Sequence, residues 1–318
     1  MSTVADSARS VVEPSPRSRR IAGLVVIAYA LVSLIPMVWI VLTGFKTPND
    51  AIAYPPKVLF EPSLEGYVNL FTTRSRQTPE YMASLPPPET WYDALVRSRN
   101  MVIAGPSRFA ERYLNSVIIG FGSTFLAVFL GTLAAYGFSR FRVPLKDDLL
   151  FFILSTRMMP PIAVAIPIFL MFRTLGLSDT YLGMILLYTA VNVSLAVWLL
   201  KGFIDEIPRE YEEAALVDGY TRFQAFVKVV LPQAVTGIAA TAIFCLIFAW
   251  NEYAFALLLT SGNAQTAPPF IPTIIGEGGL DWPAVAAGTT LFLLPILVFT
   301  VLLRQHLLRG ITFGAVRR

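Results

Sequence analysis

Six long apolar runs constrain what this chain can fold into more than any other feature of its sequence. A helix needs about 20 mostly apolar residues to cross the hydrocarbon core of a bilayer. The runs are Ile21 to Phe45, Asn115 to Ser139, Leu149 to Phe172, Tyr181 to Leu200, Val235 to Thr260 and Ala284 to Leu303. The sequence therefore predicts an all-α membrane protein with six transmembrane helices.

The composition agrees with a membrane location and excludes several other classes. Hydrophobic residues make up 55% of the 318 residues and charged residues 14%, whereas soluble domains carry about 25% charged residues. The net charge of +4 does not indicate nucleic-acid binding, because the basic residues lie between apolar runs instead of gathering on one surface. A single cysteine, Cys245, and a single histidine, His306, exclude a disulfide framework and a His/Cys metal cluster.

The first apolar run is predicted to be a retained helix. It follows the basic residues Arg17, Arg19 and Arg20, a pattern that also suits a signal peptide. Its apolar part far exceeds the usual signal-peptide length of about 7 to 15 residues, and no A-x-A site follows it. Residues 1–20, rich in Ser, Pro and Arg, are expected to form a disordered cytoplasmic tail, and residues 21–318 the transmembrane domain.

The distribution of Lys and Arg predicts the orientation. Basic residues in short connections resist translocation and stay in the cytoplasm. The two tails and the links after spans two and four hold fifteen Lys and Arg, and the alternate short links hold one, Arg173. Both termini are therefore predicted to be cytoplasmic.

Two connections are too long to be simple turns. Residues 46–112 form a predicted external insertion, and we expect a short helix within Glu89 to Val102, with Trp91, Tyr92 and Leu95 on one face. The insertion has two possible roles: it is either a solvated cap over the outer opening of the membrane domain or a docking surface for a partner. Residues 201–233 form the predicted cytoplasmic loop.

The cytoplasmic loop is patterned as two short helices. Pro208 suits a first turn, and Gly219 suits the left-handed residue that ends a helix. Thr221 and Gln224 match a capping box that opens a second helix, which we expect Pro232 to end.

This loop resembles the EAA loop of ABC-importer permeases. The matching residues are Glu213-Ala214-Ala215, Gly219, Val229 and Leu231-Pro232, with Val where the family usually has Ile. Further segments resemble the carbohydrate-importer branch that includes the smaller subunit of the maltose permease. They are Arg112 to Ile119, Leu175 to Leu182, Trp250-Asn251-Glu252, Arg309-Gly310-Ile311-Thr312 and Gly314-Ala315-Val316. The insertion, particularly Thr73 to Pro106, is longer than expected for that branch.

The resemblance implies a type I importer permease in a bacterial inner membrane. Its implied partners are a companion permease, two ATPase subunits and an external solute-binding protein, besides membrane lipid. This chain would bind no cofactor, since it has no G-x-x-x-x-G-K-[ST] sequence. ATP and Mg²⁺ would be bound by the ATPase partners, so this chain would not be an enzyme itself.

The resemblance also implies two contact regions. The ATPase contact would be made by Glu210, Glu212, Glu213, Ala214, Ala215, Asp218 and Gly219. The contact with the binding protein would be made by Gly276, Glu277, Gly278, Gly279 and Trp282.

Two charged residues inside the apolar runs need a partner or a water-filled path, because a charge at mid-membrane is costly. Arg157 lies roughly 13 Å into its run and Glu252 roughly 12 Å, at about 1.5 Å per residue. Either they pair with each other or with a companion subunit, or they line a substrate path. The path candidates are Arg157, Met158, Asn192, Trp250, Asn251 and Glu252.

Three classes of function can be compared with these observations. The first is the permease subunit of an ATP-driven importer for a sugar, polyol or derivative. The second is a stand-alone secondary transporter or channel, which would need an inverted repeat or several intramembrane carboxylates for ion coupling; this chain has one such carboxylate. The third is a membrane-embedded enzyme, which needs clustered reactive groups that the sequence does not offer.

Overall fold

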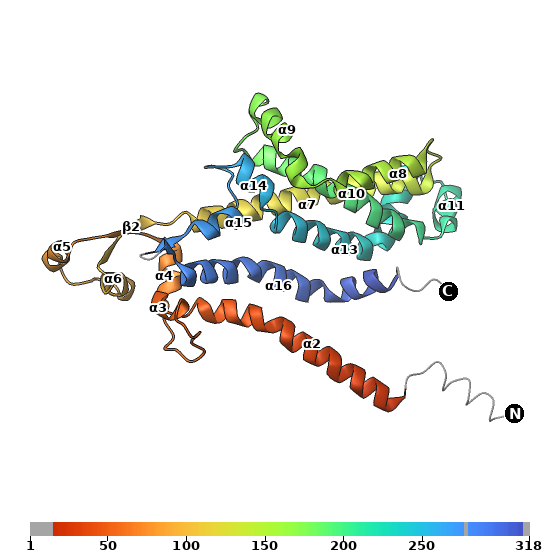
Figure 1. The fold of residues 1–318 in the computed structure, drawn as a ribbon. Helices are drawn as coiled ribbons and strands as arrows, with labels where there is room; N and C mark the ends of the chain where they lie inside the picture. Colours follow the sequence, from red (N-terminus) through yellow and green to blue (C-terminus); the bar gives the residue numbers. More distant parts are fainter. Residues whose placement is uncertain (1–14, 277–278, 314–318) are drawn as a thin grey trace. The chain divides into compact units, whose positions relative to one another are not determined.

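The spanning helices of the predicted membrane protein are present. The computed structural model describes residues 15–276 and 279–313 (Figure 1). By length and composition, five helical segments there can cross a membrane: α2 (Pro16–Thr43), α7 (Phe109–Arg140), α10 (Tyr181–Asp205), Arg222–Trp250 and the Trp282–Leu302 part of α16 (Trp282–Phe313). A sixth crossing is made by Lys146–Met158 and Pro161–Thr174 if this pair, bent by 92°, counts as one span. The chain is therefore a mostly helical membrane protein, as predicted.

Several predicted boundaries differ from the observed ones. Helix α2 begins at Pro16, so the last five residues of the expected disordered tail are helical; Ser15 caps them by accepting a hydrogen bond from the Ser18 amide. Residues 1–14 of that tail lie outside the described residues. The fourth run continues as helix to Asp205, so the first five residues of the predicted loop, 201–205, are helical.

Two of the predicted runs are not single helices. The third run divides into α8 (Lys146–Ser155), the 3₁₀ turn η1 (Thr156–Met158) and α9 (Pro161–Thr174). Two successive prolines cause this break, because proline has no N–H and disfavours helical geometry in the residue before it. The fifth run ends as a helix at Trp250 instead of Thr260, and α14 (Ala254–Leu259) follows after three residues.

The chain divides into two compact units. The first comprises Met1–Leu70, Arg76–Val102 and Asp281–Thr290, and the second comprises Phe71–Ser75, Ile103–Leu280 and Leu291–Arg318. In the first unit, residues far apart in the sequence are therefore packed together.

The predicted external insertion is folded. It contains α3 (Pro48–Ala51), α4 (Glu65–Phe71), α5 (Pro79–Ser84) and α6 (Trp91–Arg97), with α6 inside the range expected for a helix. In the first unit, α4 lies against the start of α16: a Cβ at Gly66 would come within 2.7 Å of the Pro283 carbonyl oxygen. The Asn69 amide donates to the Asp281 carboxylate at 2.8 Å.

The described part of the chain also contains two short two-stranded β-sheets. Strand β1 (Thr72–Arg76) pairs with β2 (Met101–Pro106). Strand β3 (Ile275–Gly276) pairs antiparallel with β4 (Gly279–Leu280), with Ile275 opposite Leu280.

The core of the second unit is formed by α7, α10 and α13 (Leu231–Trp250). Small residues allow these helices to approach closely, as is common between membrane helices. A Cβ at Gly131 would lie 2.5 Å from the Ala196 Cβ, and one at Gly237 would lie 2.3 Å from the Phe203 ring. Gly131 therefore fixes the contact of α7 with α10, and Gly237 fixes that of α10 with α13.

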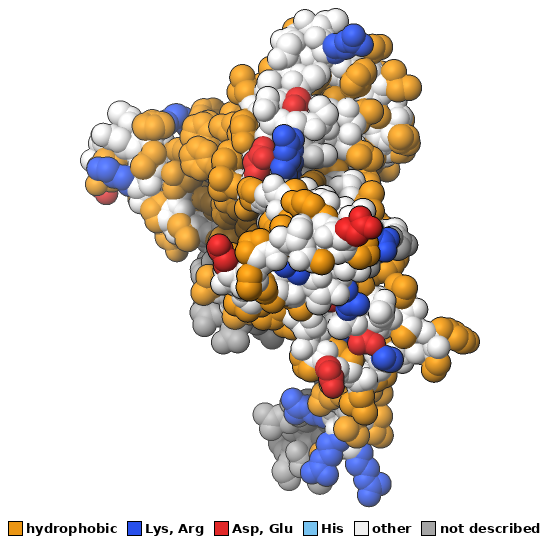
Figure 2. Space-filling view, turned by 90° about the vertical axis from the view of Figure 1, so that its left-hand side faces the viewer, with side chains coloured by type: hydrophobic (Ala, Val, Ile, Leu, Met, Phe, Trp, Pro, Cys, Tyr) orange, Lys and Arg blue, Asp and Glu red, His pale blue; other side chains and the backbone are white. Residues whose placement is uncertain are grey.

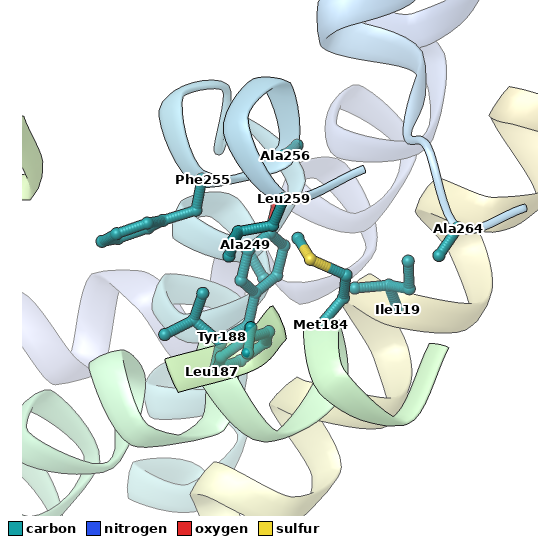
Figure 3. Packing of buried hydrophobic residues seen from close by; sticks show 10 residues of the cluster. Ile119, Met184, Leu187, Tyr188, Ala249, Phe255, Ala256, Leu259 and Ala264 are labelled. Carbon is teal, nitrogen blue, oxygen red and sulfur yellow. The ribbon is translucent and has the colours of Figure 1, made fainter. Parts of the chain in front are cut away.

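Apolar side chains fill this core and also cover much of the helix surface. One buried cluster joins Ile119, Met184 and Tyr188 to Phe255 and Leu259 of α14 (Figure 3). On the face shown in Figure 2, apolar side chains cover broad areas between small groups of charged residues. In α2 no residue of the apolar stretch is buried, which suits a surface that meets lipid or another membrane protein.

Candidate functional site

The loop between α10 and α13 has the predicted helix-turn-helix form. Helix α11 (Arg209–Val217) follows Pro208, and Gly219 adopts φ +90°, a left-handed conformation that side chains rarely adopt. Helix α12 (Arg222–Ala225) opens with the predicted capping box of Thr221 and Gln224. These elements confirm the predicted start and end of the first helix and the predicted start of the second.

The expectation that Pro232 ends the second helix is wrong. The chain continues from α12 through a π-helical turn, η2 (Phe226–Val230), directly into α13, where Pro232 lies in the first turn. The wider turn of η2 shifts the hydrogen-bond register ahead of Pro232, so the second helix is continuous with the fifth span.

The seven predicted ATPase-contact residues lie on two faces of the loop. Exposed residues form what we call the outward face of the loop: Glu210, Glu213, Ala214, Asp218 and Gly219. Glu212 and Ala215 are buried, at 7% and 6% exposure. The helical period explains this division, because successive residues on a helix point about 100° apart.

Glu212 is held by residues of α7. Its carboxylate accepts hydrogen bonds from the Tyr136 hydroxyl at 2.8 Å and from Nε of Arg140. Arg140 also donates to the Ile207 carbonyl at 2.8 Å. Tyr136 and Arg140 were not predicted to contact Glu212, which lies 72 residues from Arg140 in the sequence. The available signal was a basic residue at the end of a predicted span on the same predicted side of the membrane as the acidic loop.

The two charged residues inside the apolar runs do not pair with each other. The Arg157 guanidinium lies 4.1 Å from the centre of the Phe248 ring and donates to the Val191 carbonyl at 3.3 Å. Glu252 accepts from the Tyr188 hydroxyl at 2.6 Å and from the amides of Phe255 and Ala256 at 2.8 and 3.1 Å. Glu252 therefore caps α14, and no carboxylate in the described part of the chain forms an ion pair with Arg157.

The other path candidates are divided between core and surface. Trp250 is 2% exposed, stacks on Phe292 at 4.8 Å between ring centres and donates to the Phe292 carbonyl. Asn192 is also 2% exposed and donates to the Cys245 carbonyl at 3.3 Å. Met158 and Asn251 are exposed. The exposed candidates thus lie at the two helix breaks, and the buried ones pack in the core.

Asp179, which follows α9, binds the loop after α14 through hydrogen bonds. Its carboxylate accepts from the amides of Ser261, Asn263 and Ala264 at 3.2, 2.9 and 3.0 Å. Burial raises the pKa of Asp179, but the backbone N–H groups outweigh it and leave the pKa below its usual value. The α7 residues Arg112 and Asn115 hold the same loop, through the carbonyls of residues 262, 263 and 265.

The predicted binding-protein contacts are partly placed. Gly276 and Gly279 belong to the β3–β4 ribbon, and Trp282, 49% exposed, begins α16. Glu277 and Gly278 lie outside the described residues.

Residues 127–312 match the family described as "Binding-protein-dependent transport system inner membrane component". The chain is also 32% identical to the probable ABC transporter permease protein y4oR of Sinorhizobium fredii, over 91% of this chain and 92% of that protein. The chain belongs to this family of ABC-importer permeases. It is a multi-pass inner membrane protein of an importer that works with a solute-binding protein, and permease components are not enzymes themselves.

Other relatives and a solved structure agree with the family and the fold. The permease is 39% identical to the trehalose transport system permease protein SugB of Mycobacterium tuberculosis, over 66% of this chain and 77% of SugB. It is 27% identical to the trehalose/maltose transport system permease protein MalG of Thermococcus litoralis, over 92% and 94%. A bacterial ABC transporter that imports alginate has a chain of the same fold, with a TM-score of 0.65 at 19% identity over 92% of this chain and 99% of that one.

Proposed function

We propose that this permease carries a carbohydrate or carbohydrate-like solute, meaning a sugar, a polyol or a derivative of either. The observation that carries the proposal is the 39% identity to SugB, whose name gives trehalose as its solute. MalG is named for trehalose and maltose, and the relative SmoH of Agrobacterium fabrum for sulfoquinovosyl glycerol. All three named solutes are sugars or sugar derivatives.

The proposed assembly contains a companion permease and two ATPase subunits, which bind the ATP and Mg²⁺. The outward face of the loop supports an ATPase contact, because it offers the carboxylates of Glu210, Glu213 and Asp218. An exposed acidic helix face suits charge-assisted hydrogen bonds with arginines of a partner. In this proposal Glu212 and Ala215 do not touch the ATPase, because both are buried within the permease.

The proposed substrate path runs past the two helix breaks. Arg157 lies at the first break and is half-buried, and Asn251 lies exposed at the second. Broken helices at mid-membrane often form binding sites in transporters, because their backbone groups are free for a ligand or water. The region from Gly276 to Trp282 is the proposed contact with the solute-binding protein.

Co-expression with the proposed companion permease and ATPase subunits, followed by purification and reconstitution, tests this function. We expect an ATPase to co-elute with the permease, and hydrolysis to rise when the solute-binding protein is added with trehalose, maltose or mannitol. Hydrolysis stimulated by amino acids or peptides, with no response to any of these sugars, would contradict the carbohydrate class. Purification without any ATPase would contradict the assembly.

A further inference from the structure

Glu212 is a buried acidic residue that the proposed ATPase contact does not use. The side chains of Glu212 and Arg140 are 9% and 6% exposed, and they form an ion pair between α11 and the last residue of α7. A buried charge is costly unless it is paired and hydrogen-bonded, and removing one partner leaves the other uncompensated. The pair therefore holds α11 in one position against α7.

Further contacts surround this pair and involve the same elements. The Arg209 guanidinium donates to the Ser139 carbonyl at 2.6 Å, so a second residue of α11 is attached to α7. The Tyr136 ring packs on the Phe226 ring with 4.4 Å between centres, which attaches η2 to α7 as well. The helix-turn-helix is thus fixed to a span that is 72 residues away from it in the sequence.

We infer that Arg140 and Glu212 form a rigid joint through which a displacement of α11 is passed directly to α7. The inference rests on the proposed function, in which an ATPase moves the loop. Through the chain itself, α11 is connected only to α10, by residues 206–208, and to α12, by residues 218–221. The joint adds α7, so that α7, α10 and α13 move with the loop as one body. Arg140 and Glu212 are positioning residues in this role.

The distance between α7 and α11 tests the joint. Gly137 on α7 offers a label site, because an added Cβ there meets no atom within 4 Å. Val217 at the end of α11 is 87% exposed and lies outside the proposed ATPase contact. Spin labels on the Gly137→Cys and Val217→Cys variant would report the distance by pulsed dipolar spectroscopy, and the buried native Cys245 should stay unlabelled. The complex is measured without nucleotide and after trapping with MgATP and vanadate.

A rigid joint predicts one narrow distance distribution that is the same in both states. Glu212→Gln should broaden it, because the amide cannot form the ion pair, and Arg140→Gln should broaden it equally. The double variant should be no broader than either single variant, since both remove one interaction. Glu206→Gln is the matched control: it removes an exposed carboxylate at the end of α10 and should leave the distribution unchanged.

Three results would overturn the joint. They are a distance that changes between the two states in the parent, a Glu212→Gln distribution equal to the parent's, and additive broadening in the double variant. If Glu212→Gln does not insert, Arg140→Gln is measured alone, and a width equal to the parent's again overturns the joint. The comparison without nucleotide needs no ATPase, so a failure of the ATPase to co-purify counts against the proposed function alone.

Discussion

At the scale of single residues, side chains at the ends of helices hold backbone groups that would otherwise lack partners. Glu252 caps α14 where the fifth span breaks, and Asp179 binds three backbone amides of a loop more than 80 residues away. Asp179 itself has φ +54°, a left-handed conformation. Both carboxylates lie in segments that the resemblance covers, but spacing alone could not show which amides they accept from, because their partners are set by the tertiary fold.

Asp179→Asn should lower the stability of the purified permease at neutral pH. Asparagine tolerates the left-handed backbone, so this change isolates the loss of the negative charge. Because the folded pKa of Asp179 is lowered, its stabilisation is present above the unfolded value, 3.8, and is lost as the pH falls through the folded value. Thermal unfolding in detergent from pH 7 down to pH 3 should show the gap between variant and parent closing. The exposed residue Glu89 gives the control, Glu89→Gln, and a gap that is independent of pH would contradict the role of the charge.

Glu252→Ala should destabilise the permease by about 1 kcal/mol, the usual cost of losing a helix cap. Tyr188→Phe removes the hydroxyl donor but keeps the cap, so it should cost less than Glu252→Ala. Denaturation of the two variants in parallel measures the difference. An equal loss in both would mean that the bond to the Tyr188 hydroxyl, and not the capping of α14, is what matters.

At the scale of elements, the sequence could predict which segments are spanning helices, but not every position where those helices break. Apolar length predicted six crossings and gave each as one helix, although the pair Pro160-Pro161 was a local signal for the break in the third run. The break after Trp250 has no proline, and it depends on the Glu252 cap that forms only in the folded chain. The capping box and Gly219 predicted the loop well because those signals are local.

Gly131→Ala and Gly137→Ala form a matched pair on α7. The added methyl at Gly131 would lie 2.5 Å from the Ala196 Cβ, whereas none of the neighbouring atoms lies within 4 Å at Gly137. Overpacking predicts a loss of about 1 to 3 kcal/mol for Gly131→Ala. Gly137→Ala should be neutral or slightly stabilising, because alanine favours helix over glycine. Equal melting temperatures for the two variants would contradict the close approach of α7 and α10.

Gly219→Asp and Glu213→Lys should uncouple ATP hydrolysis from transport while the permease still inserts. The first strains a left-handed turn, and the second reverses a charge on the outward face of the loop. Hydrolysis by the reconstituted complex, with and without the solute-binding protein and trehalose, measures the effect. Normal stimulation in both variants would contradict the coupling role of the loop.

At the scale of the whole molecule, the orientation of the termini remains a prediction from the count of Lys and Arg. The folded insertion was not predictable in detail, since its contacts join segments far apart in the sequence, such as Asn69 and Asp281.

The predicted orientation can be tested by labelling. A cysteine at Val217 should react with an impermeant maleimide only in inside-out vesicles, and one at Glu89 only in right-side-out vesicles. Labelling from the opposite sides would reverse the topology.

The adjacent carboxylates Glu212 and Glu213 point to different surroundings, one buried and one exposed. Deleting one residue early in α11 would rotate everything after it by about 100°. The exposed carboxylate would then turn towards Arg140, and an alanine methyl would replace it on the outward face. We therefore expect the fold of α11 to tolerate single substitutions at its exposed positions, but not a change in its number of residues.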